Sequence, residues 1–274
     1  MKHVFLCTAL LSAILFSIGG ACADDRKMAE ELYSKSGLAE QVKDIGAAVL
    51  VGYRNNYRRS DKHSVRDEQI NRQIERVIDD SFDPETLRDT VIVGQTTDLS
   101  AEDLEAALAW LDSPVGEKVT ELEEKASSEE GVKGLQDFAR NFNKSSVSAE
   151  RVRLIRELDQ ALHITETALD ITLSTQFALS MTTREGDETL TRDDIRDLFD
   201  DFQKYRPQLE PLVENRVHAS LLYTYQQLTD KELGEYLAFA KSAKGAKYNR
   251  ITALYLTRAI TASCLDFAWE INQL

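Results

Sequence analysis

The sequence predicts an all-α protein with two tandem, related helical modules of about five helices each, packed together. Three observations predict this class. Apolar residues recur at spacings of three and four, Gly and Pro are sparse at 12 and 4 residues, and one segment is repeated at a fixed offset. No alternation of apolar and polar residues indicates a strand. The β-leaning stretch 90–93 continues the helical spacing from Leu87, so we expect it to be helical.

The first residues have the pattern of a secretory signal peptide. A basic start precedes an uncharged, 15-residue apolar stretch over 4–18, and small residues ending at Ala23 follow it. A membrane span needs about 20 apolar residues, so this stretch is too short to be one. We expect residues 1–23 to be removed and the protein to be periplasmic or secreted. A lipid anchor on Cys22 is the alternative, although Gly19 stands where lipoproteins usually carry leucine.

The expected mature chain is strongly acidic. It retains 32 Lys and Arg against 47 Asp and Glu, a net charge of −15. Such a chain repels polyphosphate, so we expect no nucleic-acid partner, and no later apolar run is long enough to span a membrane. Cys264 is the only cysteine after residue 23, which excludes an intrachain disulfide. Its neighbours Leu265 and Phe267 predict a buried, structural side chain.

Two segments of the chain align without a gap at an offset of 129 residues. Residues 99–143 and 228–272 are identical at eleven of these 45 positions. Both segments open with a hydroxyl residue followed three positions later by an acidic one, which is the capping-box signal of a helix start; the pairs are Ser100 with Asp103 and Thr229 with Glu232. We therefore predict a first helical repeat over 24–146 and a second over 147–274.

Caps and short polar loops predict where the helices begin and end. The expected helices span about 26–58, 64–80, 84–96, 100–112 and 114–142, and then 149–182, 191–204, 208–226, 229–241 and 243–271. The last helices of the two repeats differ. Residues 120–134 are acidic and poor in apolar residues, whereas 249–263 are rich in them. We expect the second stretch to pack centrally and the first to face water or a partner.

A nine-residue motif occurs once in each repeat. Its members are Trp110, Ser113, Pro114, Gly116 and Lys118 in the first copy and Phe239, Ser242, Gly245 and Lys247 in the second. The serine can end one helix and cap the next, proline suits a first turn, and glycine allows a close approach. A corner between helices is the interpretation that we favour. A binding edge built around the serines and lysines is the alternative.

Through this motif the sequence resembles the domain of unknown function 2059 family, a group of helical domains in exported proteins of Gram-negative bacteria. The resemblance covers the back half of each repeat, and 32–38 is similar to the opening helix of the family. Ala243 departs from the usual proline, and two copies depart from the commoner single copy. The resemblance implies an α-helical, exported protein and no established activity.

One basic stretch is the candidate binding site. Arginine side chains beside tyrosine rings can hold phosphate, carboxylate or sugar groups, so lipopolysaccharide head groups and cell-wall fragments are candidate ligands. A solvated helix end is the alternative, because basic residues are favoured near a helix C-terminus. The candidate residues are Tyr53, Arg54, Tyr57, Arg58 and Arg59.

The sequence contains no familiar catalytic or metal-binding motif. His63, His163 and His218 are far apart, and we interpret acidic runs such as 121–124 as solvated helix faces. We expect no catalytic residues, no metal and no cofactor. The first hypothesis is a non-catalytic envelope protein that binds an unknown protein or envelope component. A binder of small molecules or lipid fragments, with a pocket between the repeats, is the alternative, and a hydrolase-type enzyme with an unrecognised site is the third.

Overall fold

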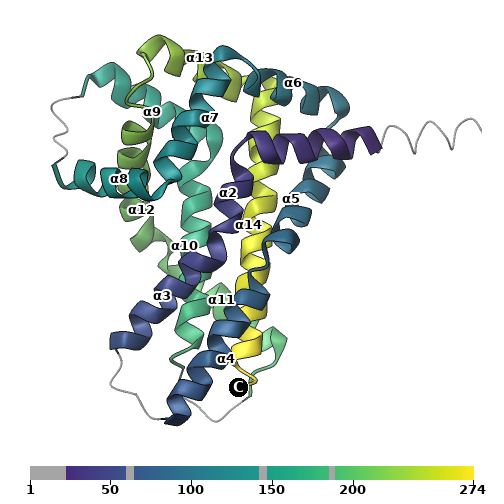
Figure 1. Ribbon diagram of the computed structural model, residues 1–274, viewed down its shortest axis with the longest axis vertical. Helices are drawn as coiled ribbons and strands as arrows, with labels where there is room; N and C mark the ends of the chain where they lie inside the picture. Colours follow the sequence, from purple (N-terminus) through teal and green to yellow (C-terminus); the bar gives the residue numbers. More distant parts are fainter. Residues whose placement is uncertain (1–22, 60–64, 142–146, 185–188) are drawn as a thin grey trace, which may run out of the picture.

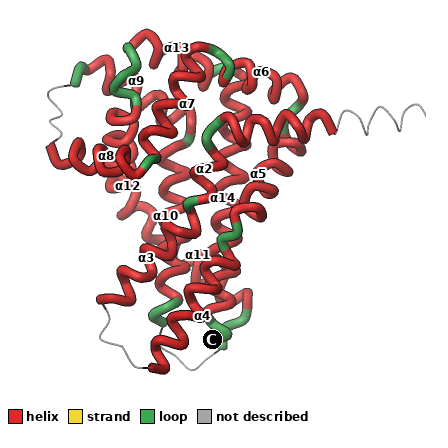
Figure 2. Tube along the Cα trace, in the orientation of Figure 1, coloured by secondary structure: helices red, strands yellow, loops and turns green. Residues whose placement is uncertain are grey.

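The computed structural model describes residues 23–59, 65–141, 147–184 and 189–274. Every regular element in these ranges is a helix and no strand occurs among them, as Figure 2 shows. The prediction of an all-α protein is therefore confirmed. The expected signal peptide lies outside the described residues except for Ala23, so export stays a prediction.

Where the structure describes the whole connection between two helices, that connection is short (Figure 1). Residues 23–35 form the first helix. The helices that follow are α2 (Leu38–Lys43), α3 (Ile45–Arg59), α4 (Val65–Ser81), α5 (Pro84–Asp98), α6 (Ala101–Leu111), α7 (Pro114–Ser127), α8 (Glu129–Asn141), α9 (Ala149–Leu162), α10 (Ile164–Met181), α11 (Arg192–Phe202), the single 3-10 turn η2 (Gln203–Tyr205), α12 (Arg206–Thr224), α13 (Asp230–Lys241) and α14 (Ala243–Ile271).

Hydrogen bonds at the helix starts confirm the predicted caps. The hydroxyl of Ser100 accepts from the amide of Asp103, whose carboxylate accepts from the amide of Ser100 in return. Thr229 and Thr191 begin α13 and α11 with the same capping box. These caps satisfy amides that no helical carbonyl can reach, and so they fix where each helix begins.

The single helix expected over 26–58 is wrong, because the chain turns twice within it. Gly37 has a φ of 73°, a left-handed conformation that glycine adopts without a steric penalty. The chain turns again at Asp44, which ends α2 directly before α3. As a result the first helix lies across the wide end of the molecule, while α2 and α3 descend along its body (Figure 1).

The helix expected over 149–182 is also wrong, because it is divided at His163. This residue has a φ of 57°, which is uncommon for a residue with a Cβ atom. Asp159 supports the turn, since its carboxylate accepts from the amide and the hydroxyl of Thr165 at 2.8 and 2.7 Å. Nδ1 of His163 lies 3.1 Å from the carboxylate of Glu166. The apolar spacing continues across this break, so periodicity alone could not reveal it.

The helix expected over 114–142 is divided at Ser128, which is a further correction. The hydroxyl of Ser128 accepts from the amide of Gly131 and donates to the carbonyl of Lys125. A serine therefore ends α7 and caps α8 in the same way that the motif serines were expected to act.

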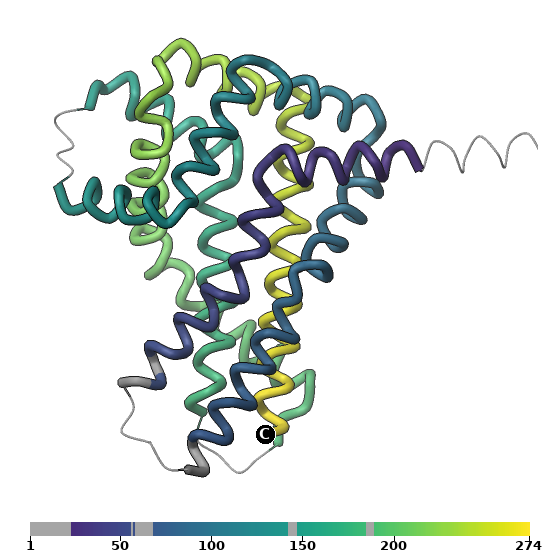
Figure 3. Tube along the Cα trace, viewed as in Figure 1, coloured from purple at the N-terminus to yellow at the C-terminus, as the bar shows by residue number. Residues whose placement is uncertain are grey.

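The last helix, α14, runs through the centre of the molecule from the wide end to the C-terminus (Figure 3). It packs against α10, α5, α6 and α4, and its buried residues include Ile251, Ile260 and Phe267. The prediction that this helix packs centrally is confirmed. Its counterpart α7 buries Val119 and Leu122 and exposes most of its acidic residues.

The hydrophobic core crosses the boundary that the sequence predicts between the two repeats. The largest cluster joins residues 29–107 to residues of α14, and a second cluster joins α7 to α9, α12 and α13. The two predicted repeats therefore share their cores and pack as one body. The duplication itself stays a prediction from the sequence.

Cys264 is fully buried, as predicted, and burial raises the pKa of its thiol. Among the described helices, none combines the length and apolar character that a membrane crossing requires.

Candidate functional site: a cavity between the two halves

Each motif forms a tight corner between two helices. The hydroxyl of Ser113 donates to the carbonyl of Trp110 at 2.6 Å and accepts from the amide of Gly116 at 3.1 Å. A Cβ atom on Gly116 would lie 2.0 Å from the carbonyl oxygen of Trp110, so only glycine fits. Pro114 occupies the first turn of α7, where it removes no hydrogen bond.

The second motif has the same geometry. The hydroxyl of Ser242 donates to the carbonyl of Phe239 at 2.7 Å and accepts from the amide of Gly245 at 3.1 Å. A Cβ atom on Gly245 would also lie 2.0 Å from a carbonyl oxygen, that of Phe239. The corner therefore forms with Ala243 in place of proline.

The two motif lysines form reciprocal ion pairs between the two halves of the chain, which are the predicted repeats 24–146 and 147–274. Lys118 donates to the carboxylate of Glu232 at 2.7 Å, and Lys247 donates to that of Asp103 at 2.5 Å. Each lysine thus reaches the capping box of the other half. The lysine contact is the largest cause that lowers the pKa of each carboxylate to about 2.

The aromatic residues of the two motifs contact each other. The rings of Trp110 and Phe239 stack with centroids 4.7 Å apart and an interplanar angle of 7°, and Tyr236 stacks on Trp110 at 5.4 Å. Offset stacking of this kind adds to the energy of area burial. The motif residues therefore join the two halves in addition to forming the two corners, and the aromatic rings form part of a wall.

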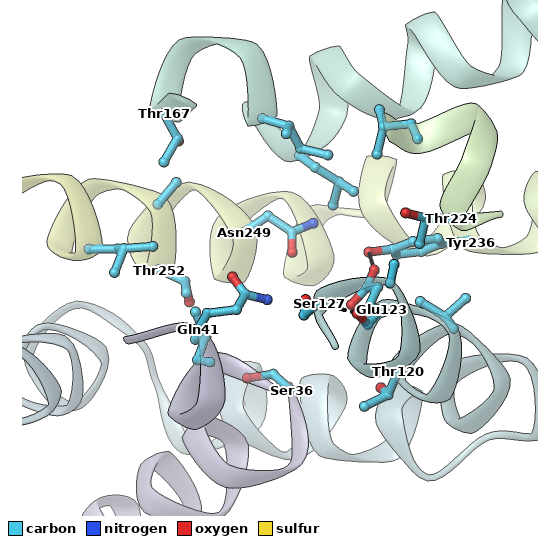
Figure 4. Close-up of a pocket in the computed structure, with 18 of the residues that line it drawn as sticks. Ser36, Gln41, Thr120, Glu123, Ser127, Thr167, Thr224, Tyr236, Asn249 and Thr252 are labelled. Carbon is cyan, nitrogen blue, oxygen red and sulfur yellow. Dashed lines mark hydrogen bonds between the residues drawn. The ribbon is translucent and has the colours of Figure 1, made fainter. Parts of the chain in front are cut away.

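That wall belongs to a cavity of about 520 Å³ between the two halves. Residues from α2, α6, α7, α9, α10, α12, α13 and α14 line it. Apolar and aromatic side chains make up much of its wall, and polar groups enter from α2, α7 and α14 (Figure 4). Gln41 and Ser127 are exposed members of the lining, which places the opening of the cavity near α2 and the end of α7.

A carboxylate lies inside this cavity. Oε1 of Glu123 accepts hydrogen bonds from the hydroxyls of Tyr225 and, at 3.5 Å, Tyr236. Burial raises the pKa of Glu123 to about 7, against the opposing effect of the two tyrosine hydroxyls. Burial and the nearby carboxylate raise the pKa of both tyrosines well above the ordinary value. The carboxyl group can therefore carry or lose its proton near neutral pH.

An amide donor without a partner also faces the cavity. Nδ2 of Asn249 is buried and makes no hydrogen bond within the described part of the chain. In Figure 4 its side chain points from α14 into the space that Gln41 and Glu123 border. A buried donor without an acceptor costs about 1–3 kcal/mol, so a native structure that retains one requires an explanation.

Corresponding residues of the two halves line the cavity together. Within the aligned segments 99–143 and 228–272, five pairs are separated by the 129-residue offset: Trp110 and Phe239, Val119 and Tyr248, Thr120 and Asn249, Glu123 and Thr252, and Ser127 and Leu256. The aromatic pair is alike, whereas the polar positions differ. Glu123 corresponds to a threonine and Asn249 to another threonine, so the carboxylate and the unpaired amide each occur in one half only.

The basic stretch that the sequence suggested as a binding site contributes no described residue to the lining of the cavity. Tyr53 is buried, packs on Tyr57 with ring centroids 6.2 Å apart, and has a pKa raised to about 12 by burial. Nε and Nη2 of Arg54 each donate to Glu75 at 2.9 Å. Tyr53 and Arg54 therefore make contacts within the protein, and binding at this stretch stays a prediction. Of the other three members, Tyr57 contacts Tyr53, and the side chains of Arg58 and Arg59 lie outside the described residues.

Neither of the described histidines, His163 and His218, lines the cavity. Nε2 of His218 lies 3.0 Å from Asp159, in the contact that supports the turn before α10. His63 lies outside the described residues. No group of three or more candidate ligands for a metal ion gathers anywhere in the described part of the chain.

Sequence reasoning missed the polar residues of the cavity. Glu123 belongs to the acidic run that we interpreted as a solvated face, and Asn249 carried no signal of its own. One available signal was the motif itself, because the helices that it joins are those that carry Glu123 and Asn249. Comparison with family models, with curated proteins and with solved structures finds no match for the chain. The resemblance to the domain of unknown function 2059 family therefore stays a prediction, and the argument for function comes from the cavity alone.

Proposed function

We propose that this protein is an exported binding protein for a small amphipathic molecule, which it holds in the cavity between its two halves. The observation that carries this proposal is a cavity of about 520 Å³ into which the buried, unpaired amide of Asn249 points. An acceptor oxygen on a ligand would satisfy that amide.

The size and chemistry of the cavity support a ligand site. Pockets for small molecules usually measure about 300–1,000 Å³ and combine apolar walls with a few polar groups. Trp110, Tyr236 and Phe239 supply aromatic surface, and the carboxyl of Glu123 is held in place by two tyrosine hydroxyls. Such a site would bury the apolar part of a ligand and orient its polar part.

The cavity favours this function over a partner-binding module or an enzyme. The lysines that would have formed a binding edge are engaged between the halves, and Arg54 is engaged by Glu75. For catalysis, the site offers one carboxyl group with a raised pKa and no second carboxylate among its described lining residues. Hydrolysis by a pair of carboxylates therefore receives no support.

The first test asks whether the protein carries a ligand. Native mass spectrometry of protein purified without detergent should show a bound mass that is lost on unfolding. Because Trp110 lines the cavity and the chain has only one other tryptophan, Trp269, the Trp269→Phe variant reports on the cavity alone. A hydrophobic probe should then change the fluorescence of Trp110 in a saturable way.

A matched pair of variants shows whether the bound probe occupies the cavity. Ala253→Phe fills it from α14, whereas Ala262→Phe adds the same side chain at an exposed position of the same helix. We expect the first variant to abolish the signal and the second to retain it. Asn249→Leu, which removes the unpaired amide, is the second variant should Ala253→Phe fail to fold. Probe binding that none of these changes affects would contradict the proposal.

A further inference from the structure

The charges that line the cavity narrow the class of ligand. This inference rests on the proposed function. Glu123 is the only carboxylate in the described lining, and no Lys, Arg or His is present there. The whole chain carries a net charge of −14. An anionic ligand would thus meet a carboxylate without a compensating cation, which is costly in a partly desolvated site.

The carboxylate of Glu123 has room for one more partner. Its Oε1 accepts from both tyrosines, Tyr225 and Tyr236, while its Oε2 makes no hydrogen bond to any described residue. The tyrosine hydroxyls fix the direction of the carboxylate. A donor in the cavity, above all a charged one, would complete its hydrogen bonding, because charge-assisted bonds are about twice as strong as neutral ones.

Aromatic rings surround this end of the cavity. Tyr225 and Tyr236 contact each other edge to face at 5.9 Å, and Tyr236 stacks on Trp110. Phe239 and Tyr248 also line the cavity. Aromatic faces attract ammonium groups, and rings grouped beside a carboxylate are a recurrent means of recognising them.

We propose that the ligand is a cationic amphiphile, a primary amine with an apolar body, whose ammonium group lies at Glu123 among the aromatic rings. Burial raises the pKa of Glu123 to about 7, and a bound cation would favour the charged form of the carboxyl. The apolar body would lie along Leu38, Ile171 and Leu256 on the walls formed by α2, α10 and α14.

Three probes with the same alkyl chain test this inference by isothermal titration calorimetry. They are decylammonium, decanol and decanoate, each used below its micellar concentration. We expect the ammonium probe to bind at least about tenfold more tightly than the other two, as a desolvated cation–π contact together with an ion pair allows. Decanoate should bind least.

Two charge-matched variants assign that preference to one residue. Glu123→Gln should bring the affinity of the ammonium probe to within about threefold of that of decanol, and should leave decanol binding unchanged. Glu121→Gln removes the same charge from an exposed position of α7 and should keep the tenfold preference. An unchanged preference in Glu123→Gln would overturn the inference, because it would show general attraction to an acidic protein.

The outcomes separate this inference from the function on which it rests. If decanol or decanoate binds as tightly as the ammonium probe and Ala253→Phe blocks all three, the cavity is a binding site and the cationic class is wrong. If no probe binds, or if Ala253→Phe blocks none, the proposed function itself fails.

Discussion

Gly116→Ala should destabilise the protein strongly, because Gly116 is the point of closest approach in the first corner. The new Cβ atom would lie 2.0 Å from the carbonyl oxygen of Trp110 and 2.9 Å from its carbon. These are backbone atoms of the preceding helix, and that carbonyl also accepts from the hydroxyl of Ser113. No side-chain rotation can therefore relieve the contact.

The expected magnitude follows from two opposing terms. Replacing a helical glycine by alanine stabilises a helix by about 1 kcal/mol. Forcing an extra atom into a tightly packed site destabilises by about 1–3 kcal/mol or more, and a contact with fixed backbone lies at the upper end of that range. We expect a net loss of about 2 kcal/mol, which for a chain of this size lowers Tm by roughly 4–8 °C.

Gly234→Ala is the matched control. It lies within α13, and no atom lies within 4 Å of the position its Cβ atom would occupy. This variant should gain about 0.5–1 kcal/mol from helix propensity alone. Urea unfolding followed by circular dichroism should therefore separate the two variants by about 3 kcal/mol, with Gly245→Ala behaving like Gly116→Ala. Equal stabilities for Gly116→Ala and Gly234→Ala would refute the corner as a structural element.

Three further predictions follow from the titratable groups. The pKa of Glu123 in the folded protein, about 7, exceeds its ordinary value of 4.5. The wild type should therefore lose about 3 kcal/mol of unfolding free energy as the pH rises from 4.5 to 8, whereas Glu123→Gln should not. Urea midpoints that are the same for the two proteins at every pH would contradict this prediction. The pKa of Asp103 is lowered to about 2, so Lys247→Met should be less stable than wild type at pH 7, and acid titrations should show that difference shrinking as pH falls from about 4 to about 2. Because Cys264 is buried, a charged thiol reagent should modify it only as fast as the protein unfolds. If peptide mapping shows that Cys264 is labelled faster than the protein unfolds, the thiol is accessible in the folded protein.

Local signals in the sequence were sufficient to predict the helix starts. The capping boxes at Ser100 and Thr229 formed as expected because a cap depends on residues within one turn of each other. The break at His163 was missed for the opposite reason. The turn at His163 depends on Asp159, which itself contacts His218 on α12. Such support comes from tertiary contacts, which apolar spacing does not encode.

The sequence could suggest a pocket between the repeats, but it could not identify the residues that line it. The burial of Glu123 depends on where α12 and α13 bring Tyr225 and Tyr236, and a charged run on a helix gives no information about that. For the basic stretch, the sequence could not show which side chains are engaged within the protein. Its residues suggested a binding surface, but Glu75, 21 residues from Arg54, engages that arginine.

The difference between the two halves explains how the cavity can hold a single charge. At an offset of 129 residues, Glu123 corresponds to Thr252, and both line the cavity. A second carboxylate at 252 would face the first in a partly desolvated space, and the repulsion would raise the pKa values of both. Thr252 instead accepts from Nε2 of Gln95 at 2.9 Å, which ties it to the first half. The residues that the halves share therefore form the corners, and the residues in which they differ supply the one acidic group and the one unpaired amide that a ligand would contact.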